Sequence, residues 1–158
     1  MQSISRILCP VDFSESSARA IVLAETLARG LSAEIVLFHV FDTAQDYTKA
    51  GQTHPVDAHL QEKLDTVLVG VNDIPIRRCM HIGPAGEAIC WFAESEQCDM
   101  IVMGTHGRTG LSHLLFGSIA EYVMRHARCP VVTVRERPML DEPLQEPLAR
   151  PIPPPRFM

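Results

Sequence analysis

Residues 103–134 read MGTHGRTGLSHLLFGSIAEYVMRHARCPVVTV. Together with the apolar residues Met100–Met103 that lead into it, the stretch predicts a short buried strand followed by a glycine-rich loop. Residues 119–127 then repeat apolar side chains at helical spacing, and residues 130–135 (PVVTVR) return to a strand pattern. Strand, loop, helix and strand in this order form the repeating unit of a parallel α/β sheet.

The rest of the chain repeats this alternation. The run IVLFHVF within residues 34–41 is continuously apolar, which is typical of a central strand covered on both faces. Pro75 lacks the donor that an interior ladder needs, so a strand over 74–82 is expected at an edge of the sheet. The remaining elements are expected as a strand over 4–11, a helix after the N-cap Ser14 that stops at Gly30, a loop over 42–56, a helix face from Leu60 to Val71 and a helix from Gly83-Pro84 to about Gln97.

Composition narrows the class of protein. A chain of 158 residues is the size of one domain, expected here over residues 1–137. Residues 138–158 hold seven prolines without periodicity and predict an extended or disordered tail, whose PIPPP segment is a candidate partner-docking motif. The formal charge of -5, with only two lysines, argues against a nucleic-acid partner. Five cysteines at unpatterned spacings, with no signal peptide and no run of about 20 apolar residues, predict a cytoplasmic protein outside the membrane.

Two turns carry the candidate site. In open α/β sheets, ligands bind beyond the carboxyl ends of the strands, where the strand order reverses. Pro10-Val11-Asp12 follows the first strand, and the chain from Gly104 onward follows the fourth. If these strands are neighbours, the two turns face each other across one crevice.

The glycine loop has the features of an anion site. Gly104, Gly107 and Gly117 are expected to bring backbone N–H groups close to a ligand and to adopt left-handed angles. Ser118-Ile-Ala-Glu121 matches a capping box, so the helix is expected to begin at Ser118 with its positive dipole end in the crevice. Ser118 is expected to cap the helix, donate to a phosphate, or exchange between the two roles. Asp12 can accept from ribose hydroxyls or hold Mg²⁺ beside the phosphates.

Familiar phosphate motifs are absent from the sequence. The loop lacks the lysine of a Walker A sequence, and the turn CPVDFSES has no glycine for a dinucleotide fingerprint. Arg108 is the one fixed cation that the loop offers to phosphates. His106 is interpreted as a solvated loop side chain more readily than as a base. Cys9 lies near the site in sequence and is interpreted as a buried apolar residue.

These residues resemble the universal stress protein family. The pattern Gly104-x-x-Gly107, nine residues, Gly117-Ser118 looks like its nucleotide-binding signature. ILCPVDFSESS (7–17), LFHV (37–40) and HIGPA (81–85) match its other landmarks in order, and only the proline-rich tail departs from the family pattern. The resemblance covers about residues 4–137. It implies an open five-stranded parallel sheet in the order 3-2-1-4-5, Rossmann-like and similar to adenine nucleotide alpha hydrolases, with helices on both faces.

The resemblance to the ATP-binding branch also implies roles for individual residues. The backbone of Val40 is expected to read adenine, Asp12 to contact ribose or metal, and Gly117 with its neighbours to take the terminal phosphates of ATP. The full set expected at the nucleotide is Pro10, Val11, Asp12, Val40, Met103, Gly104, Thr105, His106, Gly107, Arg108, Gly117, Ser118, Ile119 and Ala120. Family members usually form homodimers through the last strand, which is Val131, Val132, Thr133, Val134 and Arg135 here.

Three functional hypotheses follow. The main one is a regulatory homodimer that binds ATP with Mg²⁺ and changes its contacts with nucleotide state. The second is a slow ATP hydrolase, or a protein that phosphorylates itself on Ser118 or Thr109. The third is an interaction module that uses the proline-rich tail. Fast phosphoryl transfer depends on cations and a positioned base or water, so catalysis is expected to be slow at most.

Overall fold

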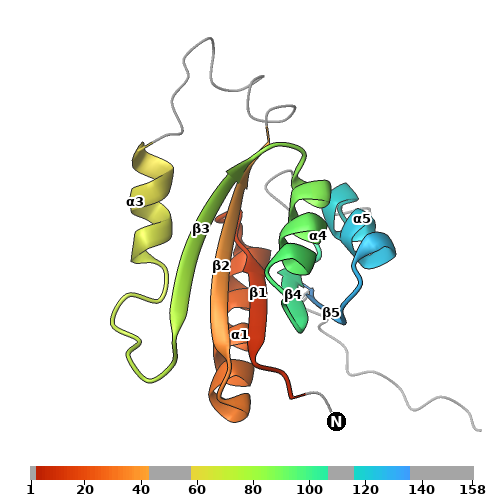
Figure 1. Cartoon of the computed structure of the whole chain (residues 1–158). Coiled ribbons are helices and arrows are strands. Elements are labelled where there is room, and N and C mark those ends of the chain that lie inside the picture. The colour runs from red at the N-terminus through yellow and green to blue at the C-terminus, as the bar shows by residue number, and fades with distance from the viewer. Residues whose placement is uncertain (1–2, 43–57, 107–115, 136–158) are drawn as a thin grey trace, which may run out of the picture.

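In a computed structural model of the chain, which describes residues 3–42, 58–106 and 116–135, five parallel strands form one sheet with helices on both faces (Figure 1). The sheet order is β3-β2-β1-β4-β5, as predicted. The elements are β1 (Arg6–Pro10), α1 (Glu15–Leu31), β2 (Glu34–Phe41), α3 (Ala58–Thr66), β3 (Ile76–Ile82), α4 (Ala85–Ser95), β4 (Met100–Gly104), α5 (Ser118–His126) and β5 (Val131–Val134).

The two central strands divide the core into two layers. Along β1, Leu8 faces the cluster under α4 and α5, whereas Ile7 and Cys9 face the cluster under α1 and α3. All three side chains are fully buried, as are Ile35 and Leu37 of β2. Alternate residues of one strand therefore serve opposite faces, which explains why these strands are apolar without interruption.

The edge position predicted for β3 is confirmed. Pro75 directly precedes the strand, and its carbonyl accepts from the Ile35 N–H at 2.9 Å. The Pro75 carbonyl takes part in the ladder, and the N–H that proline lacks would lie outside it. Proline at this position therefore removes no hydrogen bond from the sheet. The other strands lie within one or two residues of their predicted ends.

The first and third helices differ from prediction at their ends. Ser14 caps α1 as expected, with its Oγ accepting from the Ser17 N–H at 3.2 Å. The predicted end of this helix at Gly30 is wrong, because α1 continues to Leu31 and the residue with the left-handed conformation is Ser32. The face predicted from Leu60 to Val71 is helical only as far as Thr66, since Leu68 takes a positive φ of 56° and turns the chain.

The helices α4 and α5 begin differently from their sequence patterns. Pro84 precedes α4 as its N-cap, and the helix ends at Ser95, two residues before the predicted Gln97. Helix α5 does begin at Ser118, but the predicted capping box is wrong. Gly117 is the N-cap, and Glu121 pairs with Arg125 one turn further along the helix.

A bond from outside the helix explains the change at α5. The Gly117 N–H donates to the Thr105 carbonyl at 2.7 Å, while the Gly117 carbonyl accepts from the Glu121 N–H at 3.0 Å. Gly117 is thereby held in the N-cap position, and Ser118 becomes the first helical residue.

Gly104 at the end of β4 is required for close packing. A Cβ built there would lie 2.3 Å from Ser16 Oγ and 2.8 Å from the Ser16 backbone carbon. Ser16 is itself fully buried on α1. The absence of a side chain at Gly104 therefore lets α1 sit directly against the strand.

Replacing Gly104 by alanine is expected to lower the free energy of unfolding by about 1–3 kcal/mol, because a backbone atom of Ser16 cannot move away cheaply. Urea denaturation measures the change. Gly30→Ala is the matched control, since nothing lies within 4 Å of its Cβ and alanine favours a helix by about 0.5–1 kcal/mol. Equal stability of the Gly104→Ala variant and the parent would contradict this account.

Candidate functional site

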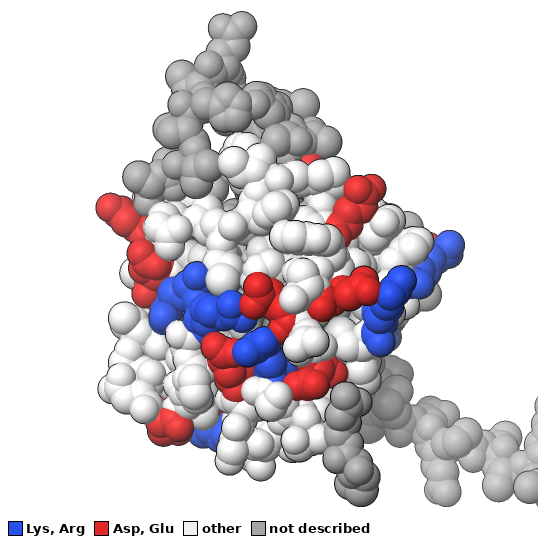
Figure 2. Space-filling model, viewed as in Figure 1, with Lys and Arg blue, Asp and Glu red and all other residues white. Residues whose placement is uncertain are grey.

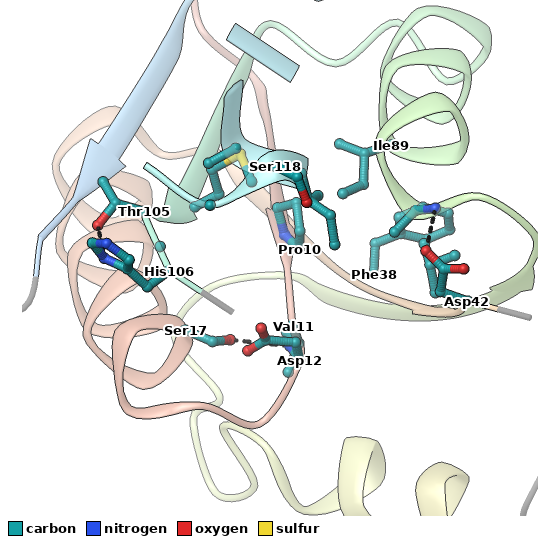
Figure 3. A pocket seen from close by; sticks show the side chains of 17 residues that line it. Pro10, Val11, Asp12, Ser17, Phe38, Asp42, Ile89, Thr105, His106 and Ser118 are labelled. Atoms are coloured by element: carbon teal, nitrogen blue, oxygen red, sulfur yellow. Dashed lines mark hydrogen bonds between the residues drawn. The ribbon is translucent and has the colours of Figure 1, made fainter. Parts of the chain in front are cut away.

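A pocket lies beyond the carboxyl ends of β1, β2 and β4, between the N-termini of α4 and α5 (Figure 3). Its volume is about 790 Å³, counting the mouth that opens to solvent. The strand order reverses between β1 and β4, so the pocket occupies the position where open α/β sheets bind ligands.

The turn after β1 forms one wall, lined by Pro10, Val11 and Asp12. Asp12 Oδ1 accepts from both the N–H and the Oγ of Ser14, at 2.9 and 2.5 Å. The Asp12 N–H donates to Ser17 Oγ at 3.3 Å. These bonds fix the direction of the carboxylate at the pocket wall.

Phe13 makes this turn sharp. Its φ of 64° is left-handed, which is costly for a bulky side chain. The ring lies 4.9 Å from the ring of the buried His39, whose Nδ1 is 2.6 Å from the Val11 carbonyl oxygen. Packing and hydrogen bonding around the turn hold Phe13 in this conformation.

The turn after β4 supplies a second wall, lined by Met103, Gly104, Thr105 and His106. Thr105 is fully buried, and its N–H donates to the Val134 carbonyl at 3.0 Å. His106 Nδ1 lies 3.0 Å from Thr105 Oγ1. His106 is thus a half-buried residue of the pocket and not the solvated loop side chain that was expected.

The start of α5 faces the pocket through Gly117, Ser118, Ile119 and Ala120. Gly117 has a φ of -72° and Gly104 has no positive φ, so the predicted left-handed glycine angles are wrong at both positions. Gly104 is needed for packing against α1, whereas Gly117 takes an ordinary extended conformation at the N-cap position beside the pocket.

Three helix N-termini meet at this edge of the sheet, and they are not equivalent. Helix α1 is capped by Ser14, and the Ala85 N–H at the start of α4 donates to Asp42 Oδ2 at 3.3 Å. The N-cap of α5 is Gly117, which has no capping side chain. The first N–H groups of a helix have no acceptor within it. An anion in the pocket is therefore best placed at α5, where those groups and the helix dipole favour negative charge.

The opposite end of the pocket is mostly apolar. It is lined by Phe38 and Val40 from β2, Ala85 and Ile89 from α4, and the carboxylate of Asp42. Phe38 is stacked on Phe92 with ring centroids 4.2 Å apart. A flat apolar ring system fits this end, while a charged group fits the α5 end.

Comparison with known proteins identifies the family of the chain. The model of the universal stress protein family matches residues 3–135. The chain belongs to the universal stress protein family.

Individual relatives cover most of the domain. The universal stress protein MJ0531 of Methanocaldococcus jannaschii is 32% identical over 83% of this chain and 82% of its own. The structure of MJ0577, from the same organism, has a TM-score of 0.74 at 27% identity and covers 86% of this chain and 99% of its own. A universal stress protein of Arabidopsis thaliana with AMP bound has a TM-score of 0.59 at 19% identity, covering 87% and 94%.

All of the residues predicted at the nucleotide that the structure describes line this pocket of the universal stress protein. Gly107 and Arg108 lie outside the described residues, as do Thr109, most of the predicted 42–56 loop and the tail. The pocket also has lining residues that the sequence analysis missed: Ser17, Phe38, Asp42, Ala85 and Ile89.

One of the missed residues had a readable signal. Asp42 directly follows an apolar strand, as Asp12 does, so the rule that identified Asp12 applies equally to it. Ala85, Ile89 and Phe38 resemble ordinary core residues in sequence, and only their position at the pocket distinguishes them.

Charge is acidic at the pocket and mixed on the face of the molecule that Figure 2 shows. Among the lining residues that the structure describes, Asp12 and Asp42 are the charged side chains and there is no lysine or arginine. On the face shown in Figure 2, acidic and basic side chains are interspersed. Ion pairs such as Arg6–Glu34 and Arg77–Glu96, both at 2.8 Å, neutralise part of the basic charge.

The residues that the structure describes contain no group of three or more His, Cys, Asp or Glu side chains that could hold a metal ion. None of their helices has both the length and the apolar composition to cross a membrane.

Cys9 is confirmed as a buried core residue. It packs in the cluster under α1, and burial raises the pKa of its thiol to about 12. Since the folded state favours the thiol over the thiolate, the stabilising contribution is present below the ordinary pKa of about 9 and is lost as the pH rises toward 12.

We therefore expect the free energy of unfolding to fall above about pH 9, by up to about 1.4 kcal/mol per pH unit from this thiol. Urea denaturation between about pH 8 and 10.5 measures the slope, and Cys9→Ala is expected to reduce it. Cys129→Ala, which removes a half-buried thiol, is the control and is expected to have a smaller effect. A slope unchanged in Cys9→Ala would contradict the assignment.

Proposed function

We propose that this universal stress protein binds ATP in the pocket and acts as a nucleotide-dependent regulatory homodimer. The observation that carries the proposal is the uncapped N-terminus of α5 at one end of a pocket whose other end is apolar. This polarity matches a nucleotide, which has a charged end and a flat ring system at the other.

The three helix N-termini indicate how the nucleotide is oriented in the pocket. Ser14 accepts from one N–H at the start of α1 and Asp42 from one at the start of α4, whereas no capping side chain meets α5, so we assign the phosphates to Ser118, Ile119 and Ala120. The base then lies between β2 and α4, near the backbone of Val40. The ribose lies between these ends, beside Asp12 and Gly104.

Magnesium fits this arrangement only together with the phosphates. Mg²⁺ is usually held by one or two carboxylates, substrate phosphates and water. Asp12 supplies one carboxylate at the pocket wall after β1, and one of its oxygens is already bonded to Ser14. Its second oxygen is the ligand that we assign to Mg²⁺, which would neutralise phosphate charge in a pocket with two acidic side chains.

The adenine base is supported by the Arabidopsis thaliana relative, which holds AMP in the same fold. The triphosphate is inferred from the resemblance of Gly104, Gly117 and Ser118 to the nucleotide-binding signature of the family. Slow ATP hydrolysis or phosphorylation of Ser118, which is exposed at the start of α5, is the second candidate. A turnover above about one per minute that is lost in Asp12→Ala would favour this candidate over a regulator.

A route from the pocket to the sheet edge supports regulation. Thr105 accepts from the Gly117 N–H and donates to the Val134 carbonyl, so it joins the phosphate end to β5. β5 is an edge strand, and we propose that it pairs with the same strand of a second copy. Nucleotide binding at α5 and strand pairing at β5 would then both depend on Thr105. We also place the protein in the cytoplasm, consistent with its free cysteines.

Calorimetric titration with ATP is expected to show micromolar binding that depends on Mg²⁺. In Gly117→Val we expect affinity to fall by roughly 100-fold or more, because the side chain fills the phosphate space. Its extended φ of -72° suits valine, so the fold is retained. Gly30→Ala, remote from the pocket, is expected to bind normally. Undiminished affinity in Gly117→Val would refute the site.

The dimer is tested at Thr133. The Pro130 carbonyl accepts from the Ile101 N–H in β4, and the Val134 carbonyl accepts from the Thr105 N–H directly after β4. By the alternation of a parallel ladder, the backbone of Thr133 therefore faces the open edge. Thr133→Pro removes an outward N–H without breaking the sheet and is expected to shift sedimentation velocity from dimer to monomer.

Met80→Pro is the matched control for this experiment. The backbone of Met80 faces outward on β3, the opposite edge of the sheet. The Pro75 carbonyl and the Gly83 N–H bond to β2, so by the alternation of a parallel ladder the odd-numbered residues of β3 face β2 and the even-numbered residues face outward. We expect Met80→Pro to remain dimeric. A monomeric parent protein, or a Thr133→Pro variant that stays dimeric, would exclude pairing through β5.

A further inference from the structure

Asp42 is an acidic side chain at the apolar end of the pocket. It follows directly on β2, is only 8% exposed and lines the pocket beside Val40, Ala85 and Ile89. Figure 3 shows its carboxylate reaching across to the start of α4, where Oδ2 accepts from the Ala85 N–H. This bond fixes the orientation of the carboxylate.

A carboxylate at this position discriminates between purines. Its two oxygens offer about four lone-pair sites and no hydrogen, so it can accept from a ligand while it also accepts from Ala85. The amine at position 6 of adenine is a donor, whereas hypoxanthine and guanine carry a carbonyl oxygen there. A carbonyl beside the buried carboxylate places two acceptors together and leaves both without a donor between them.

We propose that Asp42 is a specificity-determining residue that selects nucleotides with a 6-amino purine and rejects those with a 6-oxo purine. The inference rests on the proposed nucleotide function and assigns its base selectivity to one side chain. The amine donates to the Asp42 carboxylate, and the apolar surfaces of Phe38, Val40 and Ile89 hold the ring in place.

The fixed surroundings give this contact its discriminating power. The Phe38 ring is stacked on Phe92, and Ala85 holds Asp42 through the backbone of α4. A base with the wrong group at position 6 therefore meets a wall that cannot rearrange without breaking the hydrogen bond between Asp42 and the Ala85 N–H. Hydrogen bonds to charged groups contribute roughly 1.5–3 kcal/mol, which corresponds to about 10- to 100-fold in affinity.

A purely structural role for Asp42 makes a different prediction. If Asp42 only caps α4, asparagine serves as well, because its amide oxygen also accepts from the Ala85 N–H. Asp42→Asn thus keeps the cap, removes the charge and adds an NH₂ group that can donate to a 6-carbonyl. Its effect on selectivity separates the two roles.

The experiment is calorimetric titration with Mg²⁺ and three nucleotides: ATP, ITP, and purine riboside triphosphate, which lacks the amine. In the parent protein we expect ATP to bind about 10- to 100-fold more tightly than ITP, with the purine analogue between them. In Asp42→Asn the ratio of ATP to ITP affinity is expected to fall to within a few fold, mainly through a gain for ITP. Asp65→Asn, an exposed change on α3, is expected to keep the parent ratio.

The outcomes are distinguishable. If ATP binds but the parent shows no preference over ITP, or Asp42→Asn keeps the parent preference, the specificity role is overturned while the nucleotide function stands. If no nucleotide binds the parent protein, the proposed function and this inference both fail. Thermal melting checks that Asp42→Asn is folded, and Asp42→Ser, whose hydroxyl also accepts from Ala85, is the second variant with the same expected loss of selectivity.

Discussion

Thr105 makes the backbone hydrogen bonds on which the pocket depends. Its N–H holds the Val134 carbonyl of β5, and its carbonyl holds the Gly117 N–H at 2.7 Å. The second bond places the start of α5 against the end of β4 although residues 107–115 separate them in sequence. Because Thr105 is fully buried, water does not compete for these bonds. The position of the α5 N–H groups, and hence the anion end of the pocket, follows from this one residue.

The pocket acquires its polarity from the way three similar helix starts are satisfied. Serine caps α1, an aspartate from a neighbouring strand meets α4, and glycine precedes α5. A capping side chain at α5 would occupy the space and the N–H groups that an anion needs. Side-chain acceptors therefore meet N–H groups at two of the helix starts, and the third is the one to which we assign the anion. This division also places Asp42 at the end of the pocket that we assign to the base.

Several features of the site were predictable from particular residues. Asp12 follows a strand and precedes a helix cap, so its place at the crevice depends only on local order and on the rule for parallel sheets. Asp42 meets the same rule, since it directly follows β2, and its place at the crevice was equally predictable. The capping box failed for a different reason: Ser118 and Glu121 have the right spacing, but the tertiary bond from Thr105 to Gly117 moves the cap by one residue. Gly104 lines the pocket, and a Cβ built there would also meet Ser16, a contact that the sequence did not indicate.

The sequence by itself determined the fold class, the edge position of β3 and the two turns of the site, because hydrophobic period, proline and N-cap signals act over a few residues. The resemblance to the universal stress protein family added the strand order. Only the tertiary structure decided which helix start stays uncapped, which glycine packs against α1 and where Asp42 points. These properties depend on contacts between Asp42 and Ala85, Gly104 and Ser16, and Thr105 and Gly117, whose partners are distant in sequence and meet only when the sheet and its helices have assembled.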